Sequence, residues 1–270
     1  MKIICNLCGQ DKYKVLEIIA AYEVVRCEDC GLIYINPFPE TKKLFSHYNQ
    51  EYYQPWLEQQ SLRQKMWQQR VKKIQALKST GKLLDVGCGT GIFLNTAKSQ
   101  GWDVYGTEVS EYAAQRIKNT FGIEVFVGKL EDARFPENFF DVITFWHVLE
   151  HTTDPLGNLI AARKLLSPGG MLVVVVPNIN NYIYKIAYRM IKFKRPALFS
   201  LANREIHLYF FSVDTLKKMM EKAGLVPVKF DLDKERIFVG ERIIDNFAWA
   251  LFKLTGLNLG LAFEVYAKKR

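Results

Sequence analysis

The chain has 270 residues, of which 49% are hydrophobic and 24% are charged. This composition supports one large core and excludes a disordered or fibrous protein. Lys and Arg outnumber Asp and Glu by 37 to 28, a net charge of +9, which favours an anionic partner without separating nucleic acid, membrane and phosphate-bearing substrate. No apolar stretch predicts a transmembrane helix and no leader precedes the first cysteine, so we expect a cytoplasmic protein with reduced cysteines.

Four cysteines form two Cys-x-x-Cys pairs near the N-terminus: Cys5 with Cys8, and Cys27 with Cys30. This spacing is typical of a closed tetrahedral zinc site, in which the metal stabilises a small fold and has no open position for catalysis. Strand-like runs lie at 13–19, 22–26 and 32–35. We therefore predict a β ribbon over residues 1–40 that holds one structural Zn²⁺. Four ordinary buried cysteines and a redox pair are the alternatives.

The rest of the chain divides into three regions. Residues 41–80 predict a helical connector, whose tyrosines are expected mainly to pack. Residues 81–180 alternate strands with helices, which indicates a parallel, doubly wound α/β sheet. Residues 181–270 are expected to form a lid or acceptor region and to complete the sheet.

A glycine loop follows the first strand of the α/β region. The strand ends at Asp85, and the loop contains Gly87, Gly89 and Gly91 before a helical pattern begins. Because Ile92 stands where a dinucleotide fingerprint needs its third glycine, a pyrophosphate cradle is disfavoured, and the Lys-Ser/Thr of a P-loop is absent. The second strand ends at a carboxylate, Glu108, which is placed to accept hydrogen bonds from two ribose hydroxyls. Together these features indicate an adenosine-containing ligand.

With these motifs the sequence resembles the class I S-adenosylmethionine-dependent methyltransferases. The resemblance covers about residues 83–178 and rests on Asp85 to Gly91, Phe140 to Ile143, Leu149-Glu150-His151 and Leu165 to Gly170. The Leu-Glu-His motif and the cysteine ribbon are similar to those of methyltransferases from bacterial sugar and polysaccharide pathways. The resemblance implies a Rossmann-like seven-stranded sheet and S-adenosylmethionine as the cofactor.

The resemblance also implies roles for single residues. Asp85 and the loop glycines Gly87, Gly89 and Gly91 hold the methionine moiety, Glu108 holds the ribose, and Trp146 and His147 line the floor near the sulfonium. Lys129 stands where relatives usually carry an Asp that meets the adenine amino group. We expect this contact from Glu131 or Asp132, or from the backbone of Leu130.

Methyl transfer requires an acceptor aligned with the S–methyl bond and, for a protonated acceptor, a base. Two histidines are candidates for this base. His147 follows the fourth strand at the carboxyl edge of the sheet, and His207 lies in a segment that resembles the family's His-Leu-Tyr-Phe-Phe segment. His151 is expected to be a structural hydrogen-bond partner. A divalent metal held by these three histidines and Glu150 stays open as an alternative.

The C-terminal region contains a basic segment, residues 181–204, with six Lys or Arg and no acidic residue. Lys185, Arg189 and Lys192 fall on one helical face, which we expect to overhang the acceptor pocket and to recognise an anionic group. A solvated lid and contact with an anionic membrane surface are the alternatives. Phe247 to Leu254 is expected to pack on the core, and Leu261 to Tyr266 to form an antiparallel edge of the sheet.

We predict an S-adenosylmethionine-dependent methyltransferase acting on a small molecule, with a sugar, nucleotide-linked sugar or glycolipid intermediate as acceptor. An RNA methyltransferase with the ribbon as RNA platform is the first alternative. Residues 5–30 disfavour it, because they carry three basic and five acidic side chains. A non-catalytic cofactor-binding protein is the second alternative. The sequence does not indicate an oligomeric state.

Overall fold

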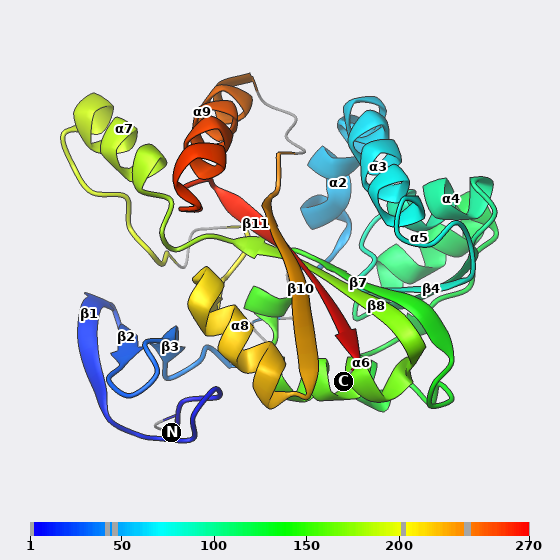
Figure 1. Cartoon of the computed structure of the whole chain (residues 1–270), viewed down its shortest axis with the longest axis horizontal. Coiled ribbons are helices and arrows are strands. Elements are labelled where there is room, and N and C mark those ends of the chain that lie inside the picture. The colour runs from blue at the N-terminus through cyan, green and yellow to red at the C-terminus, as the bar shows by residue number, and fades with distance from the viewer. Residues whose placement is uncertain (1–2, 41–43, 45–47, 201–203, 235–238, 270) are drawn as a thin grey trace.

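The computed structural model describes residues 3–40, 44, 48–200, 204–234 and 239–269. They form a seven-stranded sheet with helices on both faces and a four-stranded sheet beside it (Figure 1). The predicted α/β fold with a Rossmann-like sheet is therefore confirmed.

The large sheet has the strand order β10-β11-β8-β7-β4-β5-β6. The bounds are β4 Lys82–Val86, β5 Asp103–Glu108, β6 Phe126–Val127, β7 Phe140–Trp146, β8 Leu166–Pro177, β10 Leu225–Leu232 and β11 Ala262–Lys269. Strands β4 to β8 pair in parallel, while β11 is antiparallel to both of its neighbours. The expectation for residues 261–266 is corrected in one respect: β11 lies inside the sheet and β10 forms the edge. Phe263 and Val265 of β11 are fully buried, which an interior strand permits.

Side chains of the parallel strands alternate between two cores. Leu83 and Val142 face one group of helices, and Leu84 and Ile143 face the other. The first group is α3 (Gln60–Gln75), α4 (Ile92–Ser99) and α5 (Glu111–Phe121), and the second is α6 (Pro155–Leu165) and α8 (Val213–Lys222). The carboxyl ends of β4, β5 and β7 consequently open on one edge of the sheet, where ligands of such folds bind.

The N-terminal ribbon contains β1 (Tyr13–Ile19), β2 (Tyr22–Cys27) and β3 (Ile33–Asn36), close to the predicted runs. A fourth strand, β9 (Tyr209–Phe210), comes from the other end of the chain and pairs with β3. Tyr34 of the ribbon and Tyr209 of β9 belong to the same buried cluster as the helices beneath the large sheet. A ribbon of this size buries too little apolar area to be stable alone, and the shared core supplies part of what it lacks.

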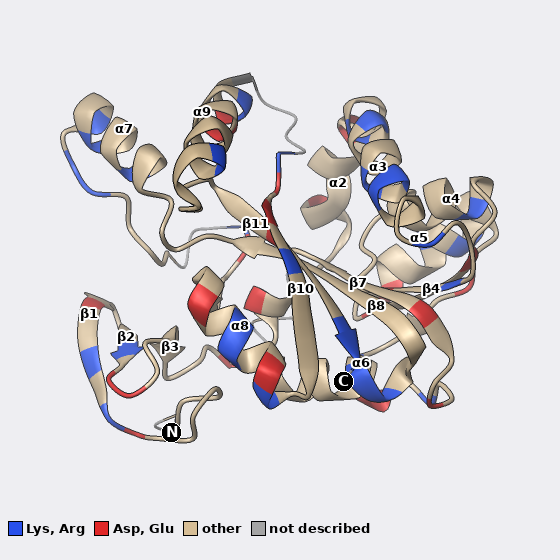
Figure 2. Ribbon diagram, viewed as in Figure 1, with Lys and Arg blue, Asp and Glu red and all other residues tan. Residues whose placement is uncertain are grey.

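The predicted connector is helical where it is described, with α2 (Gln50–Glu58) running into α3, while residues 41–43 and 45–47 lie outside the described part. Two further helices, α7 (Tyr182–Lys192) and α9 (Val239–Thr255), lie together at one end of the molecule (Figure 1). Both helices carry Lys and Arg residues (Figure 2). The expectation that residues 247–254 pack on the core is corrected, because Phe247 and Leu254 are exposed.

Among the described residues, none of the helices combines the length and the apolar character that crossing a bilayer requires.

Candidate active site

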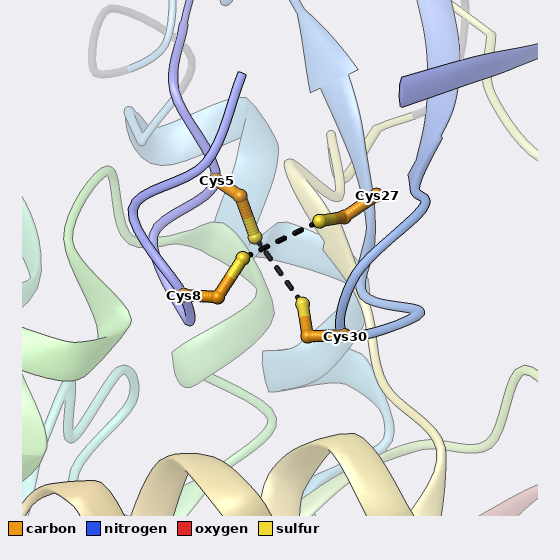
Figure 3. A group of neighbouring side chains, drawn as sticks. All are labelled: Cys5, Cys8, Cys27 and Cys30. Carbon is orange, nitrogen blue, oxygen red and sulfur yellow. Dashed lines mark hydrogen bonds between the residues drawn. The ribbon is translucent and has the colours of Figure 1, made fainter. Parts of the chain in front are cut away.

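The four cysteines of the ribbon converge on one point (Figure 3). Their Sγ atoms all lie within 4.8 Å of one another, with 3.4 Å between Cys5 and Cys30 and between Cys8 and Cys27. All four are free thiols. Tetrahedral zinc with Zn–S bonds of about 2.3 Å separates its sulfurs by about 3.8 Å. The cysteines therefore fit a zinc ion, and four thiolates leave it no open position.

Two glycines let the chain turn around this site. Gly9 and Gly31 each follow a cysteine pair and adopt φ of +79°. This left-handed region favours glycine, because a Cβ there meets the neighbouring carbonyl. The turns bring both sulfurs of each pair to the same side, as expected when each Cys-x-x-Cys pair supplies two ligands to one metal ion.

A cavity of about 520 Å³ opens at the carboxyl ends of β4, β5 and β7. Seven of the predicted site residues line it: Asp85, Gly87, Gly89, Glu108, Leu130, Trp146 and His147. The opposite wall comes from α2 and α3 of the connector, with Glu205 and Glu241 from the C-terminal region. Strand ends and connector thus enclose one space large enough for a small-molecule ligand.

The glycine loop is shaped by close packing. Gly87 has φ of +66°, and a Cβ built on it would lie 2.8 Å from the Val148 side chain. Gly91 does not line the cavity. It caps α4 at φ of +74°, and a Cβ there would lie 2.6 Å from Ile117 of α5. The first glycine therefore lets the loop approach the cavity wall, while the last one lets α4 pack on α5.

Glu108 is held at the end of β5 by donors from three directions. Gly89 N donates to Oε2 at 2.8 Å, and Ser110 N and the Tyr53 hydroxyl donate to Oε1 at 2.9 and 3.3 Å. Burial raises the pKa of this carboxyl, and the two backbone donors oppose that rise. A carboxylate offers about four acceptor positions, so a ligand hydroxyl can use the remaining one or replace Tyr53.

Asp85 lies at the end of β4, also fully enclosed. Thr144 Oγ1 of β7 donates to its Oδ1 at 2.7 Å. Burial raises the pKa of Asp85 to about 8, an effect that the Thr144 hydrogen bond opposes. A cationic ligand group near this carboxyl would favour its ionised form.

The expected adenine contact lies in the single turn at Leu130–Asp132. Leu130 is buried and lines the cavity, together with Lys129 and Glu131. Asp132 is not among the lining residues. Leu130 and Glu131 therefore remain the candidates for this contact.

The connector forms an aromatic wall across the cavity from the strand ends. It contains Tyr48, Tyr52, Tyr53, Trp56 and Trp67. The three tyrosine rings meet edge to face, with Tyr52 at 4.8 Å from both Tyr48 and Tyr53. We expected these tyrosines mainly to pack; they pack against one another and also line the cavity. The four-residue spacing of Tyr52 and Trp56 places both on one face of α2, and Tyr48 lies just before the helix begins.

Charged side chains interrupt the aromatic wall. The Arg63 guanidinium lies 4.6 Å from the Trp56 ring, and the Tyr52 hydroxyl donates to Glu205 Oε1 at 3.1 Å. Deeper in the wall, Arg70 is buried over the Trp146 ring at 4.5 Å and pairs with Asp233 at 2.9 Å. No local sequence pattern indicates the Arg70–Asp233 pair, because Asp233 reaches Arg70 only where the chain folds back after β10 beside the connector.

His147 lines the cavity between two buried carboxylates. Its Nδ1 is 3.5 Å from Glu150 and its Nε2 is 3.6 Å from Asp233. Burial lowers the pKa of His147, but the contacts with Asp233 and Glu150 raise it more, so the net shift is upward. Its φ of +56° is a left-handed conformation, uncommon outside glycine and often found at functional sites.

The second predicted base, His207, is not among the residues that line the cavity. Its ring contacts His151 at 4.8 Å, and burial lowers its pKa to about 4. His151 lines the cavity instead, and its Nδ1 is 2.8 Å from the Ile206 carbonyl oxygen, as expected for a structural partner. Of the two candidate bases, only His147 therefore faces the ligand space among the described residues.

Three of the four residues expected as alternative metal ligands lie close to one another. Glu150, His151 and His207 each offer one ligand atom within 4.8 Å of the others. Neither carboxylate oxygen of Glu150 has a hydrogen-bond partner in the described part of the chain, although the side chain is buried. This cluster has the donor types for a divalent cation, and His147, the fourth expected ligand, is not part of it.

The basic face of α7 does not meet the expectation that it overhangs the cavity. Lys185, Arg189 and Lys192 are absent from the lining residues, and α7 itself buries no side chain among those described. Figure 1 shows α7 beside α9, at a distance from α2 and α3. The chain leaves β8 toward that end, so the insertion extends the molecule instead of covering the site.

Known proteins resemble this chain in sequence and in fold. A family model described as "Methyltransferase domain" matches residues 48–229. The demethylmenaquinone methyltransferase of Staphylococcus saprophyticus is 28% identical over 183 residues, covering 61% of this chain and 78% of that protein. Its counterpart in Staphylococcus carnosus is 30% identical over 185 residues, covering 61% and 76%.

Solved structures agree on the fold. A SAM-dependent methyltransferase of Thermotoga maritima has a TM-score of 0.57 at 21% identity, covering 84% of this chain and 98% of that chain. A TehB-like SAM-dependent methyltransferase of Corynebacterium glutamicum has a TM-score of 0.54 at 20% identity, covering 83% and 99%.

Proposed function

The chain belongs to a family of class I S-adenosylmethionine-dependent methyltransferases, and from this premise we propose that it methylates a saccharide, either free, nucleotide-linked or carried on a lipid. The observation that carries the proposal is the mixed wall of the cavity, in which charged side chains stand among aromatic rings.

The cofactor end of the cavity supports the first half of the proposal. When bound, S-adenosylmethionine supplies an activated methyl group on its sulfonium. Glu108 would accept hydrogen bonds from the ribose hydroxyls, and Asp85 with the Gly87 to Gly89 backbone would hold the methionine end. Trp146 closes the floor beneath with its ring against Phe93 at 5.3 Å. These residues fit the cofactor, because they combine a buried carboxylate, a loop of glycines that a ligand can approach closely, and an aromatic floor.

The connector wall supports the choice of acceptor. Sugar rings present apolar C–H faces and a rim of hydroxyls, which suit aromatic rings flanked by carboxylates and guanidinium groups. Trp56 lines this space with the Arg63 guanidinium 4.6 Å from its ring, and Glu205 and Glu241 line the same space. A quinone ring also stacks on aromatic side chains, but it offers few donors to satisfy two carboxylates. The relatives named demethylmenaquinone methyltransferases make a quinone the second candidate.

His147 is the proposed base. It lies between Trp146 and Val148 on the cavity floor and is half-buried. A neutral imidazole there would take the proton from an acceptor hydroxyl, and Glu150 and Asp233 would stabilise the imidazolium that forms. Glu150 and Asp233 act through His147 and are positioning residues.

A panel of acceptors tests the proposal. Purified protein is incubated with methyl-labelled S-adenosylmethionine and saccharides, nucleotide sugars, glycolipids, quinones or RNA, and product and S-adenosylhomocysteine are counted. We expect equal amounts of both with a saccharide, and about a three- to tenfold rise in KM for Trp56→Leu, the loss of one stacking surface. Trp249→Leu, an aromatic change outside the cavity, serves as the matched control with the water-soluble saccharides. Methylation of only a quinone or only RNA would refute the saccharide proposal.

A further inference from the structure

One end of the molecule exposes apolar side chains on a helix that packs poorly. In α7, Tyr182, Ile186 and Met190 are spaced by four residues and each is more than half exposed. Phe193, at the C-cap of the helix, is 92% exposed. Large exposed side chains in one stripe are unusual for a surface that meets only water.

Basic side chains border this stripe. Arg189 and Lys192 lie on the helix beside it, and Lys194 and Arg195 follow directly; all four are exposed. The sequence from 181 to 204 contains no acidic residue. The surface therefore combines apolar anchors with unbalanced positive charge, the combination by which amphipathic helices bind anionic lipid surfaces.

Helix α9, which packs beside α7 (Figure 1), adds a second stripe. Ile243, Phe247 and Leu254 fall on one helical face and are each more than half exposed. Arg242 and Lys253 of the same helix are exposed as well. Two adjacent helices thus present apolar side chains beside exposed basic groups, while the acidic residues of α9 are Glu241 at the cavity and the buried Asp245.

The second helix also reaches the cavity. Glu241 in its first turn lines the cavity, two residues before the exposed Ile243. A molecule bound at α9 is therefore close to the ligand space. This connects the exposed surface with the chemistry at the sheet edge.

We propose that α7 and α9 form a docking surface for an anionic membrane, and that the acceptor is a saccharide carried on a membrane lipid. The second part rests on the proposed function. In this arrangement the sugar headgroup enters the cavity past Glu241, while the lipid chain stays in the bilayer. Ile186, Met190 and Phe193 insert among the lipid chains, and Arg189 and Lys192 contact lipid phosphates.

Charge favours a membrane over a second copy of the chain. A symmetric dimer brings the same patch of both subunits together. For this surface that contact would place the basic residues of one α7 near those of the other, with no acidic residue between 181 and 204 to pair with them. An anionic leaflet supplies the opposite charge for the basic residues of α7 and for the exposed Arg242 and Lys253 of α9.

Vesicle flotation tests the docking surface with the full-length protein and without any acceptor. Vesicles contain either phosphatidylcholine alone or three parts phosphatidylcholine to one part phosphatidylglycerol. We expect binding to the anionic vesicles that weakens with salt. The Arg189→Ala/Lys192→Ala variant should weaken it about thirtyfold, the effect of removing two cations from an anionic surface.

The Ile186→Asp/Met190→Asp variant should abolish flotation while leaving turnover of a water-soluble acceptor unchanged. Ile18→Asp, on the exposed side of β1, is the matched control and should float like the wild type. Absence of binding to anionic vesicles, or binding that neither variant reduces, would overturn the docking surface. A dimer in light scattering that the Ile186→Asp/Met190→Asp variant dissociates would also overturn it, in favour of a second copy.

The identity of the acceptor is tested by methylation assays, separately from vesicle flotation. Flotation together with faster methylation of a vesicle-borne glycolipid than of its soluble headgroup supports a lipid-linked acceptor. Flotation with no saccharide methylated in any form leaves the docking surface standing and refutes the proposed function.

Discussion

Replacing Glu108 with Gln tests the cofactor site by changing charge at almost constant volume. The carboxylate lies at the end of β5, and the Gly89 and Ser110 backbone amides both donate to it. An amide keeps one acceptor oxygen and replaces the other with a donor. Glu108→Gln therefore cannot accept from both amides and from ribose hydroxyls as well.

The size of the effect follows from burial. Glu108 is only 4% exposed, so water cannot take over the lost contacts. Hydrogen bonds to a charged group contribute about 1.5 to 3 kcal/mol and those to a neutral group about 0.5 to 1.5. We expect a loss of about 1 to 3 kcal/mol in the binding of S-adenosylmethionine, or about five- to 150-fold in Kd.

Isothermal titration calorimetry measures this loss, with circular dichroism to check that the variant is folded. Glu241→Gln is the control, because this carboxylate lines the cavity from α9 and has no predicted cofactor contact. It should bind the cofactor with the wild-type Kd. If folded Glu108→Gln also keeps the wild-type Kd, the assignment of Glu108 to the ribose is wrong.

Three further outcomes follow from the site. The raised pKa of His147 predicts that kcat increases with pH through a value above the ordinary imidazole pKa, and Glu150→Gln should move that rise to lower pH; an unmoved profile would contradict the role of His147. The pKa of Asp85 is raised by burial to about 8, so its contribution to stability is present in acid and lost as pH rises toward that value. Asp85→Asn should therefore raise Tm by about 2 °C or more at pH 9 with little change at pH 4, and thermal melts showing equal shifts would refute this. Cys27→Ser should lose bound zinc and destabilise the ribbon, whereas unchanged metal analysis and Tm would exclude the zinc site.

The parts of the fold that were predicted have strong local signals. The strand that contains Asp85 and the glycine loop after it are adjacent in the sequence, and the two cysteines of each pair are three residues apart. Strand β9 shows the opposite case. It has only two residues, Tyr209 and Phe210, and its pairing with β3 depends on the docking of the whole C-terminal region. No local pattern indicates such a partner.

The path of the chain after β8 likewise depends on tertiary contacts. Asn178 follows this strand directly, and its side-chain amide donates to the carbonyl oxygens of Asn258 and Gly260 at 3.0 and 3.2 Å. These contacts tie the exit of β8 to the segment before β11. The basic amphipathic character of residues 181–204 can be read from the sequence, but the direction in which the chain leaves β8 depends on distant contacts such as these.

A crystal structure of the protein with S-adenosylhomocysteine tests the central assignment most directly. We expect both ribose hydroxyls within hydrogen-bond distance of the Glu108 carboxylate, the base near Leu130, and the sulfur over Trp146 facing the connector wall. The Tyr53 hydroxyl should then have left Glu108 or share it with the ribose. A ligand with its ribose away from Glu108, or bound outside this cavity, would contradict the account.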